Sequence, residues 1–304
     1  MSTNTFRAAV VRAPSGPDSI EILDLPTRAP GRGEARIAVA AASINPVDLA
    51  VAGGVFHQRG VIPPGRQAGL GWDFAGTVIE SGPGTGVEPG ARVAGVVTGF
   101  DREIGAYADE VVIGASEFAV VPEALDLVAA STIPINGLAA AQMLDLLGAP
   151  TPESNRLLVT GAAGVVGGYL LALAGERGWQ VTGLARADDE AFVRGLGAAF
   201  TTSPDHRWDA VADGAAMQST GLALVRDGGR FVGVQPGAAP QPERGISVHT
   251  VVAHADGRLG DLLERAAAGA LPIRVHATVP LDRVADAQKE AAKPGVRGRV
   301  VLLP

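Results

Sequence analysis

The sequence predicts a two-part protein of the α/β class, with a β-rich part first and a doubly wound parallel sheet of six strands after it. In residues 1–125, short apolar runs are separated by Gly, Pro and Asp clusters, a pattern typical of strands and turns. After Pro122, candidate strands alternate with candidate helices, which favours a parallel sheet with crossover helices. A glycine-rich stretch at 161–168 joins one such strand to one such helix.

The first part of the chain is expected to form strands joined by turns. The apolar runs that we interpret as strands are Phe6–Val11, Ile20–Leu25, Ala35–Ala42, Phe74–Ser81, Arg92–Val97 and Ala106–Val112. Asn45 precedes Pro46, which biases the Asn45 backbone away from helical geometry. We therefore expect Asn45 in a loop with a directed amide, and Asp48 and Asp73 as caps or strand-end hydrogen-bonding groups.

The second part is expected to begin with a strand, a glycine turn, a helix and a second strand. Leu157–Thr160 is an apolar run of the buried-strand kind, and apolar residues continue at helical spacing through Ala174. Gly178 suits the end of that helix, and Trp179–Ala185 is the second strand. The later elements that we expect are a helix end at Val193–Ala199, strands at Trp208–Ala212, Arg230–Val234 and Ser247–Ala253, and helices at Gly221–Val225 and Leu259–Gly269.

The glycine turn between these strands indicates a dinucleotide site. A pyrophosphate needs backbone N–H groups aimed at it, and a helix N-terminus supplies those donors with a partial positive charge. Gly164 lets the backbone approach the phosphate, and Gly167 lets the helix pack close to its strand. The usual first glycine is Ala162 here, and a purely structural turn is the alternative.

The end of the second strand selects the cofactor. NAD binders place an acidic residue there for the ribose 2′-OH, whereas NADP binders often place an arginine nearby. This strand ends on Ala185 and Arg186 without a carboxylate, and Asp188 and Asp189 come later, as helix-start residues. The planar guanidinium of Arg186 suits a 2′-phosphate, which favours NADPH, although a solvated surface arginine is the alternative.

Composition excludes several classes of protein. A net charge of −7 without a basic stripe argues against a nucleic-acid surface. The absence of cysteine excludes disulfides, thiolate zinc sites and a cysteine nucleophile. The N-terminus lacks the apolar core of a signal peptide, and no apolar run is long enough to span a membrane. We therefore expect a cytoplasmic protein that binds neither nucleic acid nor membrane.

Several motifs in register carry a resemblance to a known family. In order before the glycine turn, these are Asn45-Pro46-Val47-Asp48, the run from Leu70 to Val78 (LGWDFAGTV), the run from Glu88 to Val93 (EPGARV), and the run from Gly105 to Asp109 (GAYAD). Ile133–Ala140 and the closing Gly298–Leu303 complete the pattern. Together they resemble the medium-chain dehydrogenase/reductase superfamily, in its zinc-independent quinone oxidoreductase-like branch, over essentially the whole chain.

The resemblance implies a fold and a domain division. Residues 1–122 and 275–304 would form a GroES-like β-rich domain, and residues 123–274 a Rossmann domain that binds NADPH. Members of the family hold cofactor and substrate between the two domains. They are commonly homodimers, joined through the edge of the cofactor sheet.

The resemblance also implies cofactor contacts. Besides Arg186, which would act alone or with Arg207, the expected contacts are Asn45, Asn136, Ala139, Gly161, Ala162, Ala163, Gly164, Val165, Val166, Ala185, Ser203, Asp213, Gly214, Val234, Gln235 and Pro236. Ser203 stands where the family often has a Tyr near the adenosine. The family's lysine after the second strand is absent.

The zinc ligands of the metal-dependent branch are not present. That branch binds zinc through a Cys near the Asn45 loop and a His at the position of Trp72, and neither Asn45-Pro46 nor Trp72 ligates zinc. The five histidines, His57, His206, His249, His254 and His276, show no metal-ligand spacing. The family places the strand of His249 near the nicotinamide, but a hydrogen-bonded loop histidine is the alternative that we favour. We expect no metal.

Reduction of an electron-poor acceptor remains feasible without zinc. Such a site needs to orient the acceptor, exclude water and stabilise the developing oxyanion. Asn45 is the candidate donor, with a turn-holding amide as the alternative. The proton comes from solvent or from Tyr107, for which packing in a strand is the alternative. Phe56, His57 and Trp72 are expected to line the substrate pocket.

Three functions compete. The first is an NADPH-dependent reductase of a quinone or an α,β-unsaturated carbonyl. The second is an enoyl or acyl reductase of one biosynthetic pathway. The third is a non-catalytic NADPH-binding protein, since a fold alone does not grant activity.

Overall fold

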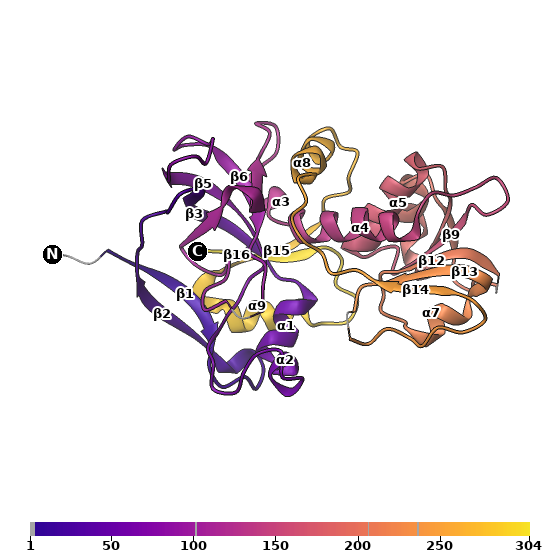
Figure 1. The fold of residues 1–304 in the computed structure, drawn as a ribbon, viewed down its shortest axis with the longest axis horizontal. Coiled ribbons are helices and arrows are strands. Elements are labelled where there is room, and N and C mark those ends of the chain that lie inside the picture. The colour runs from indigo at the N-terminus through magenta and orange to yellow at the C-terminus, as the bar shows by residue number, and fades with distance from the viewer. Residues whose placement is uncertain (1–3, 101, 206, 236) are drawn as a thin grey trace. The chain divides into compact units, whose positions relative to one another are not determined.

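The computed structural model describes residues 4–100, 102–205, 207–235 and 237–304, and these form two compact units (Figure 1). The first unit comprises residues 1–135, 255–267 and 273–304, and the second comprises residues 136–254 and 268–272. Among the described residues, no helix is both long and apolar enough to cross a membrane.

The first unit contains two sheets of mostly antiparallel strands. The three-stranded sheet has the order β2 (Ile20–Pro26), β1 (Thr5–Val11) and β4 (Ala68–Gly69). The seven-stranded sheet has the order β15 (Val275–Pro280), β16 (Arg299–Leu303), β3 (Glu34–Ser43), β5 (Asp73–Ser81), β6 (Arg92–Val96) and β8 (Phe118–Val120), and β7 (Glu110–Gly114) also pairs with β3. Among the described strands of the seven-stranded sheet, only β15 and β16 pair in parallel.

Short helices pack around these sheets. They are α1 (Pro46–Ala52), α2 (Val55–Gln58), α3 (Leu127–Ala130), α8 (Leu259–Ala267), α9 (Val284–Ala291) and the 3₁₀ turns η1 (Pro17–Ser19), η2 (Ala115–Glu117) and η4 (Leu281–Arg283). The side chains of Ile37, Phe74 and Tyr107 are fully buried in one apolar core.

One expected strand lies farther along the chain than its composition indicates. We predicted a strand at Ala106–Val112, but β7 begins at Glu110. The N–H groups of Ala106 and Tyr107 donate instead to the carbonyls of Gly71 and Leu70, at 2.9 Å each. Gly71 makes this approach possible, because a Cβ there would lie 2.4 Å from the Tyr107 ring.

The second unit is built on a parallel six-stranded sheet, as the sequence predicts. Its order is β11 (Ala199–Thr201), β10 (Gln180–Leu184), β9 (Arg156–Thr160), β12 (Trp208–Asp213), β13 (Val225–Gly233) and β14 (Ser247–Thr250). Numbered along the chain this is 3-2-1-4-5-6, the doubly wound dinucleotide-binding order. Every residue of β12 is buried, as expected of a strand covered on both faces.

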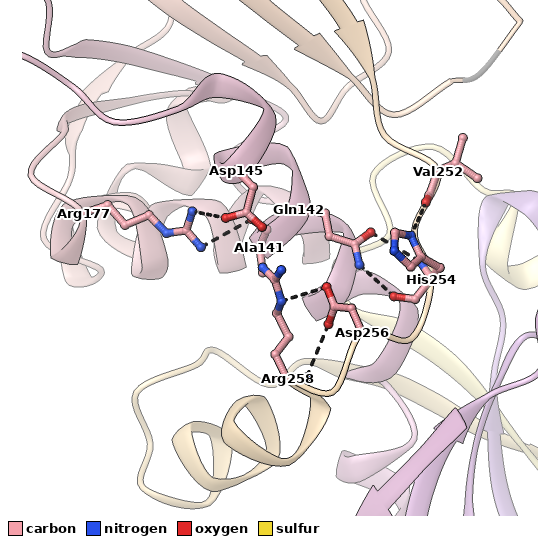
Figure 2. A network of polar contacts seen from close by, with 8 residues as sticks. All are labelled: Ala141, Gln142, Asp145, Arg177, Val252, His254, Asp256 and Arg258. Carbon is pink, nitrogen blue, oxygen red and sulfur yellow. Dashed lines mark hydrogen bonds and ion pairs between the residues drawn. The ribbon is translucent and has the colours of Figure 1, made fainter. Parts of the chain in front are cut away.

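Helices cover both faces of this sheet. They are α4 (Pro134–Leu147), α5 (Val165–Glu176), α6 (Glu190–Gly195), α7 (Ser219–Ala223) and the 3₁₀ turn η3 (Ala187–Asp189). In Figure 1, α4 and α5 lie above the strands and α7 lies below them. The chain after β14 is fixed to α4, because Gln142 Nε2 donates to the carbonyl of His254 at 2.7 Å (Figure 2). Arg177 after α5 pairs with Asp145 of α4 at 2.6 Å.

The compact units do not divide where we placed the domains. Residues 123–135 and 255–267 were assigned to the cofactor-binding domain, but they pack within the first unit. The cause is local packing: α3 contacts β3, β5 and β6, and α8 contacts β8. The domain boundaries at 122 and 274 remain a prediction.

Candidate functional site

The glycine turn lies at the carboxyl end of β9, where the strand order of the parallel sheet reverses. This reversal is the place where ligands bind in open α/β sheets. Gly164 is exposed and forms the N-cap of α5, and its N–H donates to the carbonyl of Gly161 at 2.8 Å. Gly161 has φ +61°, a conformation that favours glycine. The first N–H groups of α5 have no acceptor within the helix and are available to an anion.

Close packing behind the turn requires glycine at three further positions. A Cβ on Gly167 would lie 2.1 Å from the carbonyl oxygen of Gly161. A Cβ on Gly183 in β10 would lie 2.7 Å from Val193, and one on Gly214 would lie 2.9 Å from the carbonyl oxygen of Thr160. The helix therefore begins directly against the strand end, and Ala162 and Ala163 are buried beneath it.

Arg186 directly follows β10, at the edge of the sheet that carries the glycine turn. Its side chain is exposed, and among the described residues no hydrogen bond or ion pair holds its guanidinium. Ser203 follows the neighbouring strand β11, because Leu184 pairs with Thr201 in parallel register. The structure thus brings Ala185, Arg186 and Ser203 to one edge of the sheet. No carboxylate stands at the tip of β10.

The carboxylate of Asp213 is occupied by hydrogen bonds within the protein. Its carboxylate accepts hydrogen bonds from Thr160 Oγ1 at 2.5 Å, from the N–H of Met217 at 3.0 Å and from the N–H of Gln218 at 2.8 Å. The side chain is fully buried. It therefore shapes the loop after β12, and Gly214 lies beside the glycine turn.

The loops after β12 and β13 meet through Gln235, an expected cofactor contact, and Gln218, which we did not single out from the sequence. Gln218 Nε2 donates to Gln235 Oε1 at 3.0 Å, close to the half-buried Val234. Gln218 has φ +56°, and neither this conformation nor its partner follows from local pattern. Pro236, an expected cofactor contact, and His206 lie outside the described residues.

In the first unit, Asn45 lies in a buried polar cluster at the start of α1. Asn45 and Asp48 form a reciprocal capping box, so Asp48 is the cap that its position predicts. Asn45 Nδ2 donates to Asp73 Oδ2 at 2.9 Å and lies 3.4 Å from the carbonyl oxygen and Oγ of Ser43. These contacts favour the turn-holding amide over the free donor.

The two carboxylates of this cluster are fully buried. Burial raises the pKa of Asp73 to about 7, although the N–H of Ile135, the Asn45 amide and the positive charge of Arg299 oppose the shift. Burial also raises the pKa of Asp48, against hydrogen bonds from the N–H groups of Asn45 and Gly71.

Trp72 packs against the ring of Phe100 and the guanidinium of Arg102. The ring centroid of Phe100 lies 5.2 Å from that of Trp72 and 4.2 Å from that of Phe56. Arg102 lies over the Trp72 ring, 4.3 Å from its centroid, and donates to the carbonyls of Gly71 and Gly99. Phe56 and Trp72 are therefore joined through Phe100, which we did not select from the sequence. His57 is half-buried, and its Nε2 lies 3.4 Å from the carbonyl oxygen of Arg66.

Tyr107 is enclosed in the same unit. Its hydroxyl interacts with Asp48 but has no hydrogen bond of ordinary geometry among the described residues. Burial and the charge of Asp48 raise the pKa of Tyr107 well above its usual value, whereas burial lowers the pKa of Arg102 to about 10. The two remaining predicted contacts, Asn136 and Ala139, are buried in α4.

The residues present do not fit a zinc ion. Among the described residues, no group of three or more His, Asp or Glu side chains is arranged to hold a metal. Asp73 and Asp48 already accept hydrogen bonds from N–H and amide groups of the protein, and Trp72 supplies an indole, which does not ligate zinc. The residues do fit a nicotinamide dinucleotide, because the N-cap of α5 is the exposed Gly164, which places no side chain in front of the first N–H groups of the helix.

Comparison with known proteins agrees with this architecture. Residues 31–126 match the alcohol dehydrogenase GroES-like domain, and residues 184–302 match the zinc-binding dehydrogenase family. The solved quinone oxidoreductase of Coxiella burnetii superposes with a TM-score of 0.85 over 99% of this chain and 100% of that one, at 23% identity, which supports the fold.

The chain is also similar in sequence to several curated proteins. It is 27% identical to the chloroplastic quinone-oxidoreductase homolog of Spinacia oleracea, over 73% of this chain and 72% of that protein. It is 27% identical to the trans-enoyl reductase thnE of Trichoderma harzianum, over 73% of this chain and 68% of that protein. It is 29% identical to the pikromycin polyketide synthase component PikAII of Streptomyces venezuelae, over 92% of this chain but only 8% of that protein's length. The chain belongs to the medium-chain dehydrogenase/reductase superfamily, in its quinone oxidoreductase-like branch.

Proposed function

We propose that the protein is a zinc-independent, NADPH-dependent reductase of a quinone or an α,β-unsaturated carbonyl. The observation that carries this proposal is the free Arg186 guanidinium one strand away from the glycine turn, without a carboxylate at the tip of β10. A 2′-phosphate would pair with that guanidinium, whereas the 2′-OH of NADH would find no acidic acceptor there.

The chain's own groups divide the remaining tasks. The N–H groups of Val165 and Val166 would hold the pyrophosphate, and Arg186 and Ser203 the phosphorylated ribose. Bound NADPH would supply a hydride to an electron-poor carbon of the acceptor. Phe56, Trp72 and Phe100 would offer an apolar wall that excludes water from the acceptor.

Solvent is the proton source that we propose. Tyr107 is fully buried, and its raised pKa makes the hydroxyl a poor proton donor near neutral pH. Asn45 is proposed to hold the loop beside the nicotinamide rather than to donate to an oxyanion, because its amide N–H groups already face Asp73 and Ser43.

A panel of acceptors tests the reaction class. NADPH consumption would be followed with simple quinones, short enones, and enoyl thioesters of increasing chain length. We expect turnover with quinones or short enones. NADPH binding without turnover on any acceptor would instead favour a non-catalytic protein.

A biosynthetic enoyl reductase is the second candidate. It is favoured by the similarity to a trans-enoyl reductase and to a polyketide synthase component. Turnover confined to long enoyl thioesters would favour this candidate over the first.

Assembly as a homodimer is a further proposal, and the molar mass of the purified protein in solution tests it.

A further inference from the structure

Asp73 joins three segments of the first unit that are distant in the sequence. It is the first residue of β5, and its carboxylate is fully buried. Oδ1 accepts the N–H of Ile135 in the first turn of α4, at 2.7 Å. Oδ2 accepts Asn45 Nδ2 at 2.9 Å and Ser43 Oγ at 3.2 Å.

Each of these contacts uses the carboxylate as an acceptor. The N–H of Ile135 is one of the four amides that a helix leaves unsatisfied at its start, and a carboxylate there is also favoured by the helix dipole. Asn136 is the next residue of α4, and Asn45 precedes α1. One side chain therefore fixes the two segments that carry Asn45 and Asn136, which are both expected cofactor contacts.

We propose that Asp73 is a positioning residue of the reductase, whose carboxylate holds the Asn45 amide and the first turn of α4 in the arrangement that turnover requires. This inference rests on the proposed function for its catalytic consequence. Its structural content, the anchoring of α4, stands apart from any activity.

The charge state of Asp73 gives the proposal a second signature. The Ile135 N–H, the Asn45 amide and the Ser43 hydroxyl all donate to this group, so the ionised carboxylate satisfies them, and a protonated carboxyl loses one acceptor position. With a pKa of about 7, the ionised form grows as pH rises through neutrality. The charged or titratable groups that act on it are Asp48 of α1, Arg299 of β16 and Tyr107. Turnover is therefore expected to rise with pH near 7.

Asp73→Asn tests the proposal, because an amide offers one acceptor oxygen and turns two N–H groups toward existing donors. We expect kcat to fall about 100-fold, the loss that a misplacement of about 1 Å produces, with a smaller change in the KM for NADPH. The rise of kcat with pH near 7 should disappear. Exchange of the Ile135 amide hydrogen should accelerate by about tenfold or more. Asp73→Glu keeps the carboxylate and should recover part of each effect.

Asp209→Asn is the matched control. Asp209 is also a buried carboxylate that accepts a backbone N–H, from Arg156 at 2.9 Å, but it lies at the amino end of β12, away from the glycine turn. This variant should keep the wild-type pH profile and Ile135 protection. An Asp73→Asn protein with wild-type kcat, pH profile and Ile135 exchange would overturn the proposal. If wild type reduces no acceptor, the proposed function fails, and Ile135 exchange alone decides whether Asp73 anchors α4.

Discussion

Arg186 is the residue on which the choice of cofactor depends. Most arginines described in the structure are held by carboxylates or carbonyls, as Arg177 is by Asp145 and Arg244 by Asp227. Arg186 lies at the end of β10 and has no such partner within the described part of the chain. A guanidinium without internal partners is free to bind a phosphate.

Arg186→Ala is expected to weaken NADPH binding by about 1.5–3 kcal/mol, the value of a hydrogen bond to a charged group. NADH binding should hardly change, because NADH has no 2′-phosphate. Fluorescence titration of both nucleotides measures the two affinities. Arg177→Ala, at the opposite end of α5 and roughly 18 Å along the helix, should affect neither. An equal loss for both nucleotides would remove the role assigned to Arg186.

Single residues were predictable where a local rule governs them. Asp48 follows Asn45 at capping-box spacing, and Gly164 stands at the N-cap of α5. Phe100 and Arg102 were not predictable, because they reach Trp72 from a loop about 30 residues later, and periodicity carries no information about such pairs. The same holds for the bond between Asp73 and Ile135.

At the scale of elements, the β9–α5 unit determines the cofactor site. The strand and helix meet so closely that the backbone of Gly161 touches the place where a side chain of residue 167 would begin. By contrast, Gly175 in the same helix is exposed, with nothing within 4 Å of a Cβ at that position. Position 167 of this helix therefore requires glycine, whereas position 175 has room for a side chain.

Gly167→Ala is expected to destabilise the protein by about 1–3 kcal/mol, the usual cost of overpacking, and to weaken the binding of both NADPH and NADH. Gly175→Ala should stabilise it by about 0.5–1 kcal/mol, because alanine is the better helix former. Urea unfolding measures the two changes in the free energy of unfolding. A Gly167→Ala protein as stable as Gly175→Ala would show that α5 does not need this approach.

Elements followed from the sequence when their own residues specify them. The apolar run of β9 and the helical spacing of α5 predicted both to within a residue or two. The start of β7 was misplaced because residues 106–109 pair with Ala9 and Gly71 instead of continuing the strand. Alternation of side chains cannot show which backbone a segment will pair with.

At the scale of the whole molecule, the order of the six parallel strands, the two mostly antiparallel sheets and the matching relatives together support the superfamily. The sequence predicted this architecture because several motifs stand in register along the chain. It did not predict that α3 and α8 pack within the first unit, since the packing partner of a short helix depends on distant strands.

The most direct measurement of the central claim is NADPH oxidation by protein treated with a metal chelator, in the presence of a quinone or enone. Because the family resemblance puts Asn45, Pro46 and Trp72 where the metal-dependent branch has zinc ligands, we predict that chelation leaves the rate unchanged and that NADPH is used in preference to NADH. A rate that falls on chelation and returns with added zinc, or a preference for NADH, would contradict the account.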